Sequence, residues 1–215
     1  MAALQLDDLT VRAAPTGAGF QVSVEAAAGE VVGVAVPSAA VGRTIARTVA
    51  GLAAPLSGRV LAGGRDVTDV PAPDRGIGYV PAGGGLFPHL TLAANITYRL
   101  DPDEHVGRLV DAHVTEVTTR LDLVGVQGRL PHAVTADQRL RAAIARAVLR
   151  SPTALVIDLP EADAAALRAQ PVLDPVTLPA GDDLAVVVCT DDATLLGRLD
   201  RFAPATPARQ PHAAP

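Results

Sequence analysis

Hydrophobic and polar residues alternate along two stretches near the N terminus. The alternation runs through residues 4–12 and again through 19–25, and a turn containing proline and glycine separates the two stretches. Alternation with a period of two is typical of a strand that has one buried and one exposed face. We therefore predict an antiparallel pair of strands at the beginning of the chain.

Continuous apolar runs indicate a second kind of strand, covered on both faces. These runs are residues 31–36, 154–158 and 184–189. Helical periodicity is present in the stretches 43–50, 103–121 and 137–150. Gly51 is placed to end the first of these helices. Because strands alternate with helices, we predict an α/β fold with a mainly parallel sheet.

The amino-acid composition limits which side chains can form the core and which kinds of partner the protein can bind. Hydrophobic residues make up 49% of the chain but aromatic residues only 2%, so the core has to be built from aliphatic side chains. The formal net charge is −5, and lysine and arginine form no block, which argues against a nucleic-acid partner. Cys189 lies in an apolar run and is expected to be a small buried residue, not a reactive thiol. The five histidines are scattered without the spacing of metal ligands.

The ends of the chain give no sign of membrane insertion. The N terminus has neither a basic start nor the apolar stretch of a secretory signal. No apolar run reaches the roughly 20 residues of a membrane helix, so we expect a soluble, cytoplasmic protein. Three prolines between residues 171 and 179 predict an irregular segment. The Ala/Pro-rich stretch 203–215 is predicted to be disordered.

Several sequence segments, within and between these elements, resemble the corresponding segments of the ATP-binding subunits of ABC transporters. They follow the family's order from about Leu4 to Phe202, with near-native spacing. The segments are residues 51–60, 64–68, 75–81, 86–96, 121–128 and 142–148. The resemblance implies a P-loop NTPase-like ABC ATPase fold over residues 1–202, with an antiparallel N-terminal β subdomain and a mainly parallel core sheet. It also implies a helical lobe inserted at about residues 83–150. The segment at 86–91, Leu-Phe-Pro-His-Leu-Thr, is most similar to importers of small anions, metals and sugars.

The resemblance places the phosphate loop of that family on residues 37–44. In the pattern G-x-x-x-x-G-K-[ST], backbone N–H groups surround the phosphates, the lysine contacts them and the hydroxyl binds Mg²⁺. The expected cofactor is thus ATP with Mg²⁺. The positions implied for nucleotide binding are Ser38, Ala40, Gly42, Arg43 and Thr44, with Thr44 also on the metal.

Three residues of this segment depart from the family pattern. Pro37 and Ala40 stand where glycines belong, and Arg43 replaces the lysine with a bulkier planar fork. In an alternative register Val36-Pro37-Ser38 corresponds to the family's Gly-Pro-Ser, and the loop then carries one extra residue. The sequence does not decide between a working phosphate cradle and a plain turn from strand to helix.

The positions implied for hydrolysis are almost all replaced. Asp158 stands where the family's Mg²⁺-organising carboxylate belongs, but the general-base glutamate that should follow is Leu159. Glu161 lies beyond a proline and is not expected to reach the same point. The glutamine that should help to position Mg²⁺ and couple to the membrane partner falls at Ala82, and the histidine of the last strand falls at Asp191.

The signature motif, which meets the nucleotide of an opposing subunit in this family, corresponds to residues 134–138. Thr135 can substitute for the family's serine, and Gln138 is retained. Asp137 places a carboxylate where a phosphate belongs, so we interpret it as a helix-capping residue. The aromatic residue that stacks on adenine falls near Ala13, with Phe20 as the alternative.

Three hypotheses about function follow. The first is an ATP-binding-subunit-like component of an importer, impaired in hydrolysis. It would work with a transmembrane permease at the inner face of the membrane, as a homodimer or beside an active paralogue. The second is an ATP-independent regulatory or scaffold protein on the same fold. The third is a divergent ATPase that uses Arg43 and Asp158.

Overall fold

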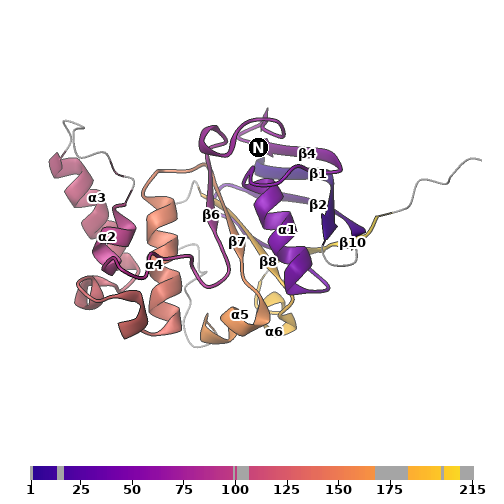
Figure 1. Ribbon diagram of the computed structural model, residues 1–215. Helices are drawn as coiled ribbons and strands as arrows, with labels where there is room; N and C mark the ends of the chain where they lie inside the picture. The colour runs from indigo at the N-terminus through magenta and orange to yellow at the C-terminus, as the bar shows by residue number, and fades with distance from the viewer. Residues whose placement is uncertain are drawn as a thin grey trace, which may run out of the picture.

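The chain folds into two sheets with helices between and beside them (Figure 1). The computed structural model describes residues 2–13, 17–98, 100, 107–167, 184–199 and 201–208. The expected α/β fold, with a parallel core sheet and an antiparallel N-terminal sheet, is confirmed. Among the described residues, no helix is both long enough and apolar enough to cross a membrane.

The antiparallel sheet is built from the alternating N-terminal stretches. Its strand order is β10-β2-β1-β4-β5. The strands are β1 (Ala2–Ala13), β2 (Ala18–Ala27), β4 (Ser57–Ala62), β5 (Arg65–Asp66) and β10 (Thr206–Pro207). Both predicted strands pair with each other as expected, and each is longer than the alternation indicated.

The parallel sheet is built from the apolar runs. Its order is β6-β7-β8-β3-β9, so the three predicted runs lie side by side at its centre. The strands are β3 (Val31–Ala35), β6 (Ile77–Val80), β7 (Ala154–Asp158), β8 (Ala185–Thr190) and β9 (Phe202–Pro204). All residues of β7 and β8 are buried, as expected for strands covered on both faces.

Six helices and three short 3₁₀ turns connect the described strands. Figure 1 shows α1 against the parallel sheet, α2 to α4 on one side of it, and α5 and α6 near the ends of β7 and β8. The helices are α1 (Ala39–Val49), α2 (Leu92–Ile96), α3 (Gly107–Arg120), α4 (Ala136–Val148), α5 (Glu161–Leu167) and α6 (Ala193–Leu196). The 3₁₀ turns are Ala72–Asp74, Val124–Val126 and Pro131–Ala133.

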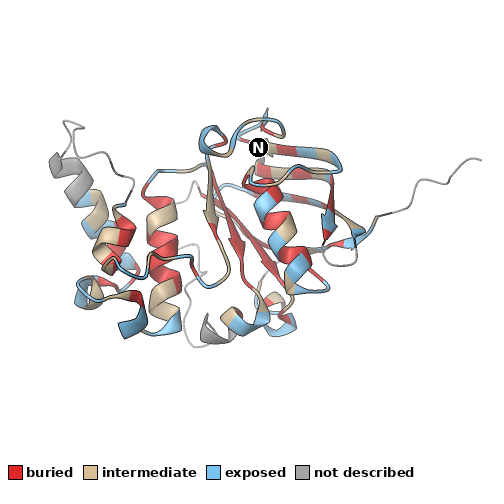
Figure 2. Cartoon of the chain, viewed as in Figure 1, coloured by how far each residue is buried: buried red, intermediate tan, exposed pale blue. Residues whose placement is uncertain are grey.

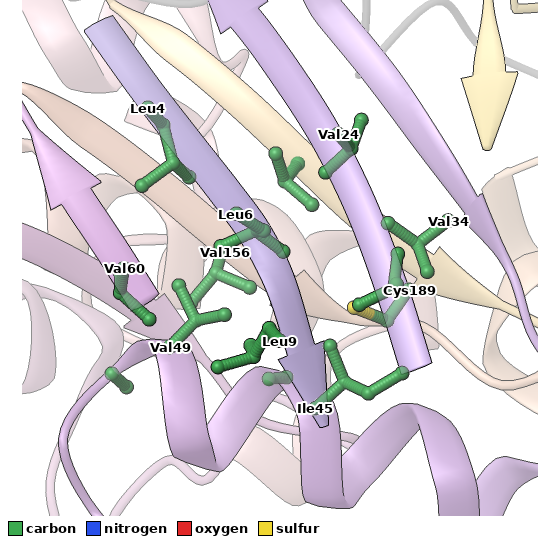
Figure 3. Packing of buried hydrophobic residues seen from close by; sticks show 14 of the residues in the cluster. Leu4, Leu6, Leu9, Val24, Val34, Ile45, Val49, Val60, Val156 and Cys189 are labelled. Carbon is green, nitrogen blue, oxygen red and sulfur yellow. The ribbon is translucent and has the colours of Figure 1, made fainter. Parts of the chain in front are cut away.

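Two aliphatic cores lie on the two faces of the parallel sheet, and the buried residues of Figure 2 follow them. The first core joins the sheet to α2, α3 and α4. The second joins the sheet to α1 and to the antiparallel sheet, as Figure 3 shows. Cys189 is buried in this second core, as predicted, and burial raises the pKa of its thiol.

Arg75 fastens the end of α1 to the connection that follows β5. Its guanidinium is almost fully buried and donates hydrogen bonds of 2.5–3.1 Å to four backbone carbonyls, those of residues 48, 49, 68 and 70. Desolvation lowers the pKa of Arg75. Gly51, with φ of +78°, ends α1 as predicted and lies directly against this side chain.

The C-terminal prediction is wrong for residues 203–208. Residues 203–204 belong to β9, which lies beside β3 in the parallel sheet, and residues 206–207 form β10, which pairs with β2. The N–H groups of Ala205 and Ala208 donate to the carbonyls of Ala35 and Gly19. Backbone hydrogen bonds to two sheets hold a segment whose composition is typical of disorder. Residues 209–215 and the proline segment 171–179 lie outside the described residues.

Candidate functional site

The connection between β3 and α1 is only three residues long. Strand β3 ends at Ala35 and α1 begins at Ala39, four residues before the predicted start at Arg43. The predicted start was wrong: Ala39 and Ala40 both favour helix, and Ala40 stands where the family has a glycine, which would resist it. The N–H groups of Val41 and Gly42 both donate to the carbonyl of Ser38, at 3.1 Å. These donors are therefore used by the helix itself.

The remaining residues implied for nucleotide binding lie around this first turn. Ser38 has extended backbone angles and precedes the helix, and its side chain forms no capping hydrogen bond. Gly42 is close-packed, since a Cβ atom there would lie 3.2 Å from Val36. Thr44 is the sixth residue of α1, and its hydroxyl donates 2.9 Å to the carbonyl of Ala40. The Thr44 hydroxyl oxygen therefore lies more than one turn inside α1 and not at the first residue of the helix.

Arg43 and Asp158 form an ion pair between α1 and the end of β7. The Arg43 Nε lies 3.6 Å from the Asp158 Oδ2. The aspartate side chain is only 2% exposed whereas the arginine is 59% exposed, so the buried anion is covered by a cation from the surface. Asp158 Oδ2 accepts no hydrogen bond within the described structure. Burial raises the pKa of Asp158, while Arg43 and the N–H of Ala82 oppose the rise.

The raised pKa of Asp158 predicts a loss of stability with increasing pH. The unfolded chain releases this proton near its ordinary pKa of about 3.9, before the folded chain does. The free energy of unfolding should therefore fall between the ordinary value and the raised folded value, by about 1.4 kcal/mol for each unit of the rise. When denaturant unfolding is measured from acidic to neutral pH, Asp158→Asn should not show this fall in the free energy of unfolding. Exposed Asp74→Asn is the control, and a difference between wild type and Asp158→Asn that is constant with pH would contradict the prediction.

Leu159 occupies the general-base position as a core residue. Its side chain is fully buried in the first core, and its N–H donates 2.9 Å to the carbonyl of Cys189. Glu161 begins α5 and is exposed. No carboxylate therefore follows Asp158 directly at the edge of the sheet.

Asp191 follows β8 and is hydrogen-bonded to the start of α5. Its Oδ1 accepts 2.8 Å from the N–H of Glu161. The carboxylate thus supports the first turn of a helix, where a negative charge is favourable. At this position the family's histidine would offer a donor, whereas Asp191 has only acceptors when ionised.

Ala82 begins a glycine-containing loop that leads from β6 toward α2. The N–H of Ala82 donates to Asp158, and the N–H of Gly83 donates 2.7 Å to the Oδ2 of Asp163 in α5. Arg146 of α4 donates to the carbonyls of Gly84 and Gly85, both at 2.9 Å. Sequence reasoning identified neither Asp163 nor Arg146, because only the fold brings α4 and α5 to this loop.

The signature-like segment forms a complete capping box. The Thr135 hydroxyl accepts 3.2 Å from the N–H of Gln138, whose side chain accepts 3.1 Å from the N–H of Thr135. The prediction that Asp137 caps the helix was wrong, since Thr135 is the cap. Asp137 instead forms a close ion pair with Arg141, which also donates to the carbonyl of Leu121.

The two positions implied for adenine stacking lie in the antiparallel sheet, Ala13 in β1 and Phe20 in β2. Phe20 is half-buried and packs against the second core, and Ala13 is almost fully buried. Among the described residues, no group of three or more His, Cys, Asp or Glu side chains is arranged to hold a metal ion.

The residues present do not fit Mg²⁺-nucleotide in the manner of the motif. The N–H groups of Val41 and Gly42 are bonded within α1, and the Thr44 hydroxyl bonds the helix backbone. Asp158 retains an oxygen without a hydrogen bond, which suits a cation, but Arg43 already supplies one. The geometry therefore provides one carboxylate and one guanidinium and lacks the cradle.

The topology nevertheless defines the class. A parallel sheet in which β3 leads directly into α1, beside a buried carboxylate at the end of β7, is the arrangement of P-loop nucleotide-binding proteins. A family model described as ABC transporter matches residues 20–162. The chain belongs to the ABC transporter family.

Relatives with similar sequences are named as import ATP-binding proteins. The chain is 36% identical over 141 residues to the sulfate/thiosulfate import ATP-binding protein CysA 2 of Agrobacterium fabrum, covering 65% of this chain and 41% of that protein. It is 35% identical over 132 residues to the putative 2-aminoethylphosphonate import ATP-binding protein PhnT of Salmonella typhimurium, covering 61% and 36%. The aligned part thus spans about two-fifths of the length of these curated relatives.

Solved structures share the fold over nearly the whole chain. The cbiO1 protein of Clostridium perfringens, part of the ABC transporter complex cbiONQ, superposes with a TM-score of 0.73 at 16% identity, covering 95% of this chain and 85% of that one. A bacterial ABC transporter cassette solved as a dimer superposes with a TM-score of 0.72 at 21% identity, covering 94% of both chains. At these identities the likeness shows the fold.

Proposed function

We propose that this protein is an ATP-binding-subunit-like component of a small-solute importer and that it does not hydrolyse ATP. The observation that carries the proposal is the first turn of α1. There the N–H groups of Val41 and Gly42 donate to the carbonyl of Ser38, and Arg43 forms an ion pair with Asp158. An internal cation and an internal acceptor thus occupy the groups that Mg²⁺ and phosphate would need.

The chemistry at the neighbouring positions supports the same proposal. A general base contributes about 10²–10⁴-fold to the rate of a reaction, and Leu159 has no group to act as one. Ala82 has no metal ligand, and Asp191 adds a negative charge where an anionic phosphate would bind. Each replacement reduces the same transition-state stabilisation, so we infer that turnover is lost.

A groove between the sheet and the helical lobe supports a partner of the permease type. Its volume is about 480 Å³, its apolar lining includes Leu52, Ile77 and Ile96, and two arginines, Arg146 and Arg150, lie beside them. The described lining contains no carboxylate. An apolar segment that carries acidic residues would complement this surface. The proposed location is therefore the cytoplasmic side of the membrane, where such a segment of a permease would reach it.

The importer relatives support the proposed class of transport. Their names refer to sulfate, thiosulfate and 2-aminoethylphosphonate, which are small anions. We propose that an active paralogue supplies the hydrolysing site in a heterodimer, because the signature-like end of α4 is also closed by its own capping box. A homodimer would contain the replaced residues in both of its sites.

A titration tests the proposal directly. The purified chain is titrated by calorimetry with Mg-ATP, with ATP lacking metal and with ADP, and phosphate release is followed in parallel. We expect no saturable heat at millimolar nucleotide and no turnover above the blank, while an active cassette assayed alongside gives both. Turnover comparable with that control would refute the loss of hydrolysis and favour the divergent ATPase. Saturable binding of Mg-ATP, abolished by Thr44→Val, would refute the closed phosphate site.

A further inference from the structure

The loop Pro81–Phe87 carries three consecutive glycines but is bonded along most of its length. Gly83, Gly84 and Gly85 have φ of +69°, +77° and +54°, which other residues rarely adopt. A run of glycines in a connection ordinarily predicts flexibility. In this loop, however, the three residues supply backbone angles that the fold requires.

The core holds the first half of this loop through two carboxylates. Asp158 accepts the N–H of Ala82, and Asp163 accepts the N–H of Gly83 at 2.7 Å. The next N–H, that of Gly84, donates 2.8 Å to the carbonyl of Pro81. Three successive donors are therefore satisfied, two of them by charged acceptors, whose hydrogen bonds are the stronger kind.

The lobe holds the second half through one arginine. Arg146 donates to the carbonyls of Gly84 and Gly85 at 2.9 Å, and its guanidinium lies 6.0 Å from the centre of the Phe87 ring. Desolvation lowers the pKa of Arg146. Its hydrogen bond to Gly84 is partly buried, whereas the one to Gly85 is exposed. The N–H of Phe87 in turn donates 2.7 Å to the fully buried Asn95 of α2.

Close packing against α4 is confined to the middle of the loop. A Cβ atom on Gly84 would lie 3.2 Å from that of Ala143 in α4, whereas one on Gly83 would meet no atom within 4 Å. The backbone at Gly84 therefore contacts α4 as well as being bonded to it by Arg146.

We propose that Asp163 and Arg146 are positioning residues that make Pro81–Phe87 a rigid brace. The brace holds α2 and α4, the two helices to which it is bonded, in one orientation relative to the parallel sheet. Asp163 belongs to α5 on the core and Arg146 to α4 on the lobe, and each bonds the loop from its own side. The inference concerns the coupling of the two parts and is independent of nucleotide binding.

Amide exchange and a spin-label distance test the brace. In Asp163→Ala, exchange at Gly83 should accelerate about tenfold or more, because one charge-assisted hydrogen bond is lost. With labels on cysteines introduced at Leu56 of the core and Val124 of the lobe, both exposed in the native chain, wild type should give one narrow distance distribution. Arg146→Ala and Asp163→Ala should broaden it.

Matched controls separate the brace from general destabilisation. Arg139→Ala removes an arginine of α4 that bonds only lobe carbonyls, those of Pro131 and Val134, and Glu161→Gln alters an exposed acid of α5. Both should leave the distribution narrow. If Arg146→Ala fails to fold, Arg146→Lys and Asp163→Ala carry the test. A broad distribution in wild type, or a narrow one in folded Asp163→Ala, would overturn the proposal.

Discussion

Replacing Leu159 by glutamate is expected to destabilise the protein by about 3–5 kcal/mol at neutral pH and not to restore hydrolysis. The substitution puts back the residue type that the family pattern requires. In this chain, however, the side chain at 159 is fully buried in the aliphatic core beside α4 and α5. A carboxylate there would lose its hydration without gaining a partner.

Denaturant unfolding and phosphate release measure both parts of this prediction. Leu159→Met keeps the volume and should cost less than about 1.5 kcal/mol. The destabilisation by glutamate should shrink in acid, where the introduced carboxyl is protonated and needs no hydration of a charge. A Leu159→Glu protein as stable as wild type at neutral pH would mean that the position opens to solvent.

Arg75→Ala should lower the free energy of unfolding by a similar amount, because Arg75 binds the C-terminal end of α1. The substitution removes the donor that Arg75 supplies to four backbone carbonyls, two at the end of the helix and two after β5. Of these, the carbonyl of Thr48 keeps the N–H of Gly51 as a donor. Leaving several buried acceptors unsatisfied is expected to cost about 3 kcal/mol or more. Thermal and denaturant unfolding measure the loss, and circular dichroism shows whether the variant still folds.

Two variants calibrate that result. Arg47→Ala removes an exposed arginine of the same helix with one long bond, 3.4 Å to the carbonyl of Leu52, and should change stability by less than about 0.5 kcal/mol. Arg75→Lys should recover part of the loss, because an ammonium keeps three donors. An effect of Arg75→Ala no larger than that of Arg47→Ala would show that water replaces the guanidinium.

The strands of the core were predictable because burial on both faces leaves a local signature. The run Ala154–Asp158 coincides with β7, and the alternating stretches mark β1 and β2, though shorter than observed. The start of α1 was not predicted. The helical periodicity began at residue 43, whereas the helix propensity of two alanines and the short link to β3 favour the start at Ala39.

The prediction for the C-terminal segment failed because its structure depends on long-range pairing and not on local sequence. Its composition predicts disorder, but the backbone of residues 202–207 pairs with β3 and β2, which lie far away in the sequence. Backbone pairing depends little on side-chain type, so composition cannot reveal it. The roles of Asp163 and Arg146 were not predicted for the same reason, since their partners are backbone groups of a loop that is distant in sequence.

The sequence by itself determined the family, the order of the elements and which reactive residue types are absent. These follow from local patterns and from the identity of single residues such as Leu159 and Ala82. Only the tertiary structure decided what the replacements do instead. In the folded chain Arg43 forms an ion pair with Asp158, Thr135 forms a capping box with Gln138, and Leu159 is buried in the core. The physical reason is that an ion pair, a cap or a buried contact depends on distances between elements that folding alone brings together.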